Sequence, residues 1–158
     1  MLARAILAVT VLAALGCEGM ATIPPGAQQV HISATKSTLR IQPAVVQAGD
    51  IYVVLDGPQQ SVVFVARHRT ADSTPGPMSA ADLDRVALGD TEGTSMEGLS
   101  VGCSEEQRTR SRGKIGHCGN VYKLVLGAGS YAFLTDSPDR DPPRPVADGS
   151  MAVLEVTR

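Results

Sequence analysis

The sequence predicts an all-β fold, a β-sandwich with Greek-key connections, one short helix and a disulfide-closed insertion. Three observations lead to this fold class. About seven short segments have the apolar patterns of strands, turn residues separate them, and a single segment has helical spacing. The chain has 158 residues, a length that suits one domain preceded by a targeting segment. Short strands with a lone helix are typical of two packed sheets.

The predicted strands fall into two groups, one in each half of the chain. Two strands of the first group alternate apolar and polar residues, and two are continuous apolar runs that suit buried strands. Three more follow near the C-terminus. The seven segments are residues 30–34, 39–42, 51–55, 61–66, 121–126, 130–135 and 151–156.

Residues 67–120, between the two groups of strands, read as an insertion. Ser79 and Asp82 resemble a capping box, and apolar residues at helical spacing follow them. Gly89 suits the position after a helix C-terminus. These signals predict a helix over residues 80–88.

The first part of the chain, residues 1–16, reads as a secretory signal peptide. Arg4 precedes an apolar run of about eleven residues, which is too short to span a bilayer of about 30 Å as a helix. Cys17 follows this run directly, as the lipidated cysteine of a bacterial lipoprotein does. We therefore expect an acyl anchor such as palmitate at Cys17.

Lipidation at Cys17 divides the mature chain into a lipid-anchored tether, residues 17–28, and a sandwich, residues 29–158. It places the protein in the cell envelope, outside the cytoplasm and attached to a bacterial membrane. Ordinary cleavage after Gly16 or after Ala21 is the alternative, and it gives a secreted or periplasmic soluble protein.

Three cysteines need an explanation in an exported protein: Cys17, Cys103 and Cys118. Lipidation accounts for the first, and the other two then pair in a disulfide within residues 89–119, which read as loop. This bond closes a loop of about fifteen residues and contributes about 3 kcal/mol in the chain-entropy model. The alternative is a metal site of Cys103, Cys118 and His117, but their spacing matches no C-x-x-C ligand set.

Motifs in both halves of the chain carry a resemblance to a known family. Residues 43–51 read P-A-V-V-Q-A-G-D-I, residues 126–135 read L-G-A-G-S-Y-A-F-L-T, and residues 149–156 read G-S-M-A-V-L-E-V. They are similar to the P-x-x-V-x-A-G-D, L-x-x-G-x-Y-x-F-x-C and G-M-x-G-x-L-x-V segments of cupredoxins, the sandwich of plastocyanin-like and azurin-like copper proteins. The resemblance covers about residues 30–66 and 121–156 and implies a cupredoxin-like sandwich.

Departures of this sequence from the family's pattern argue against a blue-copper site. Such a site needs two histidines, one cysteine thiolate and usually a weak axial methionine. Val62 occupies the first histidine slot and Thr135 the cysteine slot, while the second histidine slot falls near Asp139 or Arg140. Met151 alone matches a ligand type. We therefore expect no cofactor, with copper as the alternative.

The histidines are dispersed along the sequence, and so are the methionines. His31 lies in the first predicted strand, His68 follows a core strand, and His117 adjoins a cysteine. No pair has the spacing of metal ligands. A non-standard copper site built from His31, His68, His117 and Met151 is kept as the alternative to the absence of metal.

A hydrolase is the third reading, because residues 98–102 match the G-x-S-x-G string with Ser100 at its centre. That motif requires a strained turn between a strand and a helix, followed by an acid and then a histidine. Only His117 lies downstream, and every aspartate after Ser100 also follows His117. We therefore expect no enzyme.

The composition limits the classes of partner that the chain can bind. The net charge is −2 and aromatic residues make up 3% of the chain, which argues against nucleic-acid binding. The basic segment 108–114 reads as a solvated loop, with an acidic partner as the alternative.

We expect a non-catalytic envelope lipoprotein that acts as a binding or structural module. Its partners are the membrane and an envelope protein that contacts the insertion at residues 67–120. The alternative is a periplasmic copper-binding protein.

Overall fold

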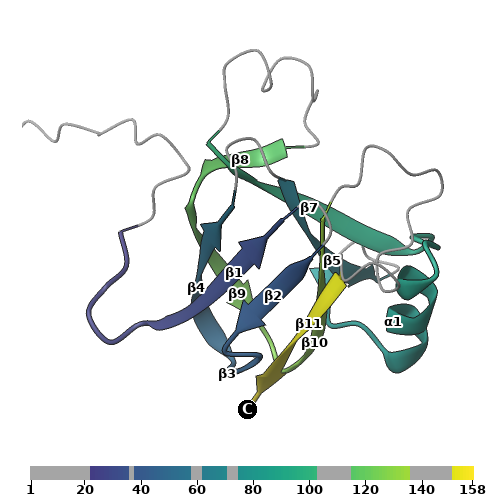
Figure 1. Cartoon of the computed structure of the whole chain (residues 1–158). Coiled ribbons are helices and arrows are strands. Elements are labelled where there is room, and N and C mark those ends of the chain that lie inside the picture. Colours follow the sequence, from purple (N-terminus) through teal and green to yellow (C-terminus); the bar gives the residue numbers. More distant parts are fainter. Residues whose placement is uncertain (1–21, 36–37, 58–61, 71–74, 103–114, 136–150) are drawn as a thin grey trace, which may run out of the picture.

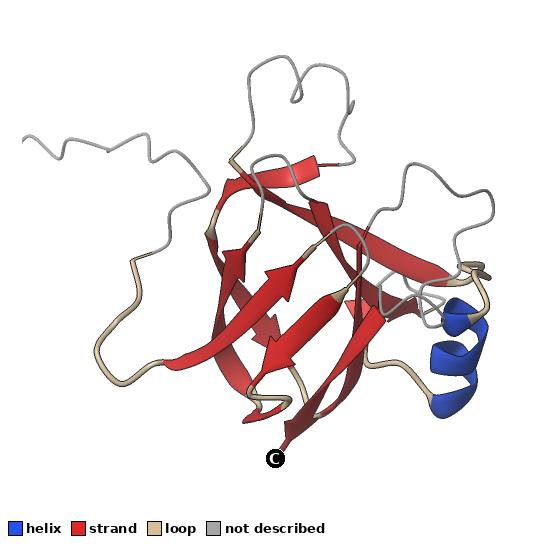
Figure 2. Cartoon of the chain, viewed as in Figure 1, coloured by secondary structure: helices blue, strands red, loops and turns tan. Residues whose placement is uncertain are grey.

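A computed structural model describes residues 22–35, 38–57, 62–70, 75–102, 115–135 and 151–158. It has two β-sheets and one short helix (Figures 1 and 2), which confirms the predicted mostly-β, two-sheet fold class. The elements are β1 Gln28–Ala34, β2 Leu39–Gln42, β3 Val45–Gln47, β4 Gly49–Asp56, β5 Val62–Arg69, β6 Pro75–Gly76, α1 Ala80–Ala87, β7 Thr94–Val101, β8 Ile115–Gly119, β9 Val121–Leu126, β10 Gly129–Thr135 and β11 Met151–Thr157.

The smaller sheet, sheet A, has the strand order β2-β1-β4-β9. β1 is parallel to β4, and the other two pairs are antiparallel. Alternation along β1 explains its orientation, because Val30 and Ile32 are fully buried whereas His31 and Ser33 face solvent. β1 begins at Gln28, so this residue belongs to the sheet and not to the expected tether.

The larger sheet, sheet B, has the order β3-β11-β10-β5-β7-β8, and β6 pairs with β5. β10 shows that both faces of this sheet are apolar. Tyr131 and Phe133 enter the core between the sheets, while Ala132 and Leu134 enter a second cluster on the outer face. Sheet B is therefore covered on both sides, by sheet A and by α1.

The core between the sheets combines aliphatic side chains from both of them, with Tyr122, Tyr131 and Phe133 as its aromatic members. Burial of such apolar area is the main stabilising term, at about 25 cal/mol per Å². The fully buried members with the largest side chains are Val30, Ile32, Ile51, Val53, Val63, Val65, Leu99, Leu126, Phe133 and Leu154.

Helix α1 confirms the prediction made from its capping signals. Ser79 is the N-cap and forms a capping box with Asp82, and Gly89 follows the C-cap with a positive φ of 85°. The helix packs on the outer face of sheet B through Val86, which is fully buried in the second cluster.

The expectation of a loop over residues 89–119 is wrong for much of this segment. β7 pairs with β5 along its length, and β8 pairs with β7, so the insertion widens sheet B. The sequence of β7, T-S-M-E-G-L-S-V, lacks a regular apolar alternation. Among those of its side chains that the structure describes, Leu99 lies in the core between the sheets. The strand forms because it pairs with the apolar β5, so its own sequence pattern does not predict it.

Several expectations fall outside the described residues. They include the signal peptide, Cys17, Cys103, the basic segment 108–114 and the second histidine slot near residue 139. Within the part of the chain that the structure describes, no helix is long and apolar enough to cross a membrane.

Candidate functional site

The residues that stand in three of the copper-ligand slots lie near one end of sheet B. Val62 begins β5, Thr135 ends β10 and Met151 begins β11. Thr135 is paired with Val63, and Leu134 is paired with Met151, so the three positions are neighbours on adjacent strands. The motif alignment and the register therefore point to the same end of the sandwich.

The three slot residues differ in chemistry from type I copper ligands. They offer an aliphatic side chain, a hydroxyl and one thioether, whereas a type I site needs a thiolate and two imidazoles. Cys118 lies two strands from Val62 in the same sheet, and its side chain is outside the described residues. The Thr135 hydroxyl is buried and has no hydrogen-bond partner within the described chain. Met151 packs against the second apolar cluster, so its thioether serves the packing under α1.

The two histidines with described side chains, His31 and His68, lie on different sheets. His31 lies on the solvent face of β1, where its Nδ1 is 3.7 Å from Asp56 Oδ2. His68 lies near the opposite end of sheet B from Met151, because Met151 neighbours Leu134, which is paired with Phe64. The side chain of His117 lies outside the described residues. The proposed four-residue copper site is therefore not formed by His31, His68 and Met151.

His68 instead belongs to a polar cluster at the start of α1. Its Nδ1 is 3.2 Å from Asp82 Oδ2, and that carboxylate oxygen also accepts hydrogen bonds from the Ser79 hydroxyl at 2.8 Å and the Ser79 amide at 3.0 Å. The Asp82 side chain is only 14% exposed. The Ser79 hydroxyl, the Ser79 amide and the nearby His68 and Arg85 hold the pKa of Asp82 below its usual value of 3.8.

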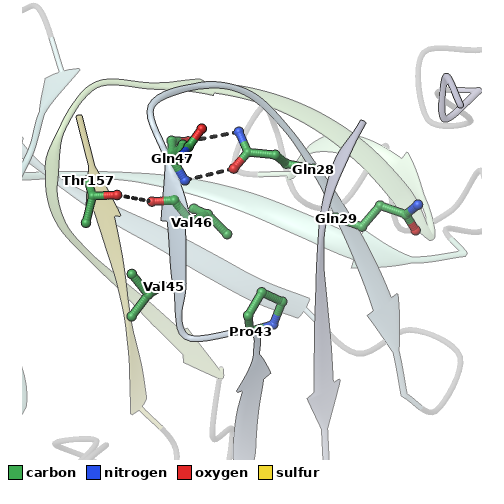
Figure 3. Close-up of a pocket in the computed structure, with 7 residues that line it drawn as sticks. All are labelled: Gln28, Gln29, Pro43, Val45, Val46, Gln47 and Thr157. Atoms are coloured by element: carbon green, nitrogen blue, oxygen red, sulfur yellow. Dashed lines mark hydrogen bonds between the residues drawn. The ribbon is translucent and has the colours of Figure 1, made fainter. Parts of the chain in front are cut away.

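A shallow groove of about 490 Å³ lies at the other end of the sandwich (Figure 3). The Gln28 amide crosses it, donating to the Gln47 carbonyl at 3.1 Å and accepting from the Gln47 amide at 2.7 Å. The Thr157 hydroxyl donates to the Val46 carbonyl at 3.1 Å. These polar groups hydrogen-bond to one another, and no charged side chain lines the groove. We therefore interpret the groove as a structural corner of the sandwich. Its lining is Gln28, Gln29, Pro43, Val45, Val46, Gln47 and Thr157.

Ser100 does not lie on a nucleophile elbow. Its backbone is in the middle of sheet B, paired with Val62 on one side and Cys118 on the other. An elbow needs a sharp turn that leads from a strand into a helix, and here β7 continues through Ser100 to Val101. The backbone geometry therefore gives the hydrolase reading no support.

The sequence reasoning missed the neighbours of His68. The capping signal already indicated Asp82, but its proximity to His68 depends on how α1 packs on sheet B. The pairing of Ala66 with Met96 depends on β7, which the sequence pattern did not reveal.

No family model and no curated protein matches the chain. Among solved structures it is similar to dithionite-reduced auracyanin from the photosynthetic bacterium Roseiflexus castenholzii, with 18% identity over 84% of this chain and 100% of that chain and a TM-score of 0.39. It is also similar to oxidised plastocyanin from Dryopteris crassirhizoma, with 14% identity over 82% and 99% of the two chains and a TM-score of 0.34. At these TM-scores the similarity carries no argument, and the cupredoxin-like assignment stays a prediction of the sequence motifs.

Proposed function

We propose that the chain is a non-catalytic cell-envelope lipoprotein whose cupredoxin-like, Greek-key sandwich acts as a binding or structural module without a blue-copper site. One observation carries the proposal. The three slots at this end of sheet B are occupied by Val62, Thr135 and Met151, which supply one thioether and neither a thiolate nor an imidazole. A soft-metal redox centre needs both of the missing donor types.

The start of β1 supports the proposed anchor. Gln28 is the first residue of sheet A, so about ten residues separate Cys17 from the sandwich. An extended segment of that length spans at most about 35 Å. The tether therefore keeps the sandwich close to the membrane surface that holds the acyl chains.

The proposed contact surface is the insertion at residues 67–120. Its described part is rigid scaffold, because β7 and β8 extend sheet B and α1 buries Val86 against it. Recognition loops are usually carried on such scaffolds. The proposed disulfide between Cys103 and Cys118 fits this arrangement, since Gly102 and Gly119, one residue away from them, are joined by a backbone hydrogen bond of 3.3 Å.

Lipid attachment tests the anchor directly. Cells expressing the wild-type chain or Cys17→Ser are labelled with radioactive palmitate and fractionated. We expect the label and membrane association in the wild type, and an unlabelled protein outside the membrane fraction in the variant. A wild-type chain that carries no label, or a variant that stays in the membrane, refutes the anchor.

Copper loading tests the absence of a redox centre. Purified wild-type protein is mixed with one equivalent of Cu(II), and its visible spectrum is recorded before and after reduction with dithionite. We expect no intense blue band at any stage. An intense band that disappears on reduction overturns the proposal, because it requires a copper–thiolate bond.

The alternative, an envelope copper-binding protein with a non-standard site, is favoured by a specific observation at one candidate ligand. His68 is the candidate whose ring nitrogen faces a mostly buried carboxylate, Asp82. Metal-binding histidines commonly have such a partner on the nitrogen that does not bind the metal.

A further inference from the structure

The outer face of sheet B carries an imidazole and a thioether on adjacent strands. On β5, Val63 and Val65 point into the core between the sheets, so Ala66 and His68 lie on the outer face with the second cluster. The register pairs Ala66 with Met96 and His68 with Thr94. Met96 and His68 are therefore diagonal neighbours on the same face of an antiparallel pair.

Diagonal neighbours of this kind have Cα atoms about 7–8 Å apart, within reach of long side chains. Met96 is 39% exposed, and the His68 side chain is 44% exposed. A methionine has three rotatable side-chain bonds. The thioether of Met96 can therefore approach the imidazole of His68 without moving any core residue.

The orientation of His68 determines which nitrogen is available. Its Nδ1 is buried and lies 3.2 Å from Asp82 Oδ2 without a hydrogen bond within the described chain, while more than two-fifths of the side chain is exposed. Metal-binding histidines commonly have a carboxylate beside the nitrogen that does not bind the metal. Because Asp82 lies on the Nδ1 side of the ring, Nε2 is the nitrogen left for a ligand role.

We propose that His68 Nε2 and Met96 Sδ form a two-coordinate site for a soft monovalent cation, Cu(I) or Ag(I), on the outer face of sheet B. Asp82 is a positioning residue that orients the imidazole and does not bind the ion. The site lies away from the Val62, Thr135 and Met151 end and changes no oxidation state.

The donor set decides the class of cation. An imidazole and a thioether are both neutral, and thioethers select soft ions such as Cu(I). Zn²⁺ prefers four donors, usually including anionic ones, and no group of three histidine, cysteine or carboxylate ligands occurs in the described parts of the chain. Asp82 Oδ2 is already engaged by Ser79, which leaves it poorly placed as an additional ligand.

The inference gives a site to the alternative function and is independent of the lipid anchor. Its test uses the purified chain under anaerobic conditions with ascorbate as the reductant, which leaves the proposed disulfide closed, and Ag(I) binding is followed by NMR of the methionine methyl and histidine ring signals. Competition with a chromophoric Cu(I) chelator measures the affinity of the site for Cu(I). We expect one equivalent to bind, with shifts confined to the signals of His68 and Met96 among the histidines and methionines.

Matched variants separate this site from general metal uptake. His68→Gln and Met96→Leu are each expected to weaken Cu(I) binding at least tenfold. His31→Gln is the control, because His31 also lies beside an aspartate, at 3.7 Å, but its paired residues are Gln42 and Val54. Met151→Leu is the second control, and both controls are expected to bind as the wild type does.

Asp82→Asn separates positioning from coordination. An asparagine side chain can still accept the hydrogen bond from the Ser79 amide, but it removes the negative charge beside Nδ1. We expect weaker binding with the same ligand shifts. Absence of binding in the wild type, unchanged binding in His68→Gln or Met96→Leu, or equal loss in His31→Gln overturns the site. None of these results bears on palmitate labelling at Cys17.

Discussion

Tyr131 illustrates how one side chain joins the turn between β9 and β10 to the core. Its hydroxyl donates to the Gly127 carbonyl at 3.0 Å, while its ring lies in the core between the sheets. Burial raises the pKa of Tyr131 above its usual value of 10.0. The hydroxyl is therefore held protonated and in place as a donor at neutral pH.

We expect Tyr131→Phe to lower the free energy of unfolding by about 1 kcal/mol, since the Gly127 carbonyl loses its donor. Urea denaturation measures this change. Tyr52→Phe is the control, because the hydroxyl of Tyr52 makes no hydrogen bond within the described chain, and its expected cost is below about 0.5 kcal/mol. Equal costs for the two variants would show that the bond to Gly127 is not the cause.

Asp82 makes stability depend on acid pH. Its pKa is lowered in the folded state, so its contribution is present above the unfolded value of about 3.8 and is lost as the pH falls through the folded value. We expect the difference in unfolding free energy between the wild type and Asp82→Asn to be full at pH 6 and to shrink below pH 4. Chemical denaturation across this range measures it, and a constant difference refutes the assignment.

Helix α1 and strand β7 show what local sequence determines at the scale of elements. The signals at Ser79, Asp82 and Gly89 act within a few residues, so the helix and its ends were predictable. β7 depends on partners more than twenty residues away, and its own pattern has no regular period. The cluster of Asp82 and His68 was unpredictable for the same reason, because it requires the packing of α1 on β5.

The cap of α1 should contribute measurably to stability. We expect Ser79→Ala to cost about 1 kcal/mol, because it removes the acceptor for the Asp82 amide. Ser79→Asn is the control that preserves a capping group. Hydrogen exchange of the α1 amides reports the effect locally, and unchanged exchange in the alanine variant contradicts it.

The buried face of α1 gives a second test at this scale. Val86 is fully buried against sheet B, whereas Leu88 at the C-cap is 79% exposed. We expect Val86→Ala to cost about 2 kcal/mol and Leu88→Ala less than about 0.5 kcal/mol in thermal or urea unfolding. Comparable costs would mean that the helix is not packed on the sheet.

For the whole molecule, the two-sheet architecture followed from the strand patterns, but the full extent of sheet B did not. The apolar runs of β4, β5 and β10 indicated buried strands, and all three are buried on both faces over part of their length. β3 and β8 are short, and their partners lie far away in the sequence or in the insertion. The motifs alone indicated which end of sheet B holds the three ligand slots. Val62 and Met151 each begin a strand there, and Thr135 ends one.

The disulfide is a prediction at this scale. We expect no free thiol from Cys103 or Cys118 in the exported protein under non-reducing, denaturing conditions, and one disulfide by mass spectrometry. Reduction is expected to lower the unfolding free energy by about 3 kcal/mol, because it removes the constraint on the unfolded chain. Two titratable thiols in the exported protein would refute the pairing.

The Gln28 amide also protects the outer edge of sheet B. β3 is the terminal strand of that sheet, and its Gln47 peptide group is already bonded in both directions by this one side chain. A strand from another molecule would have to displace the amide before it could add to the edge. The corner thus discourages edge-to-edge aggregation between copies of the sandwich.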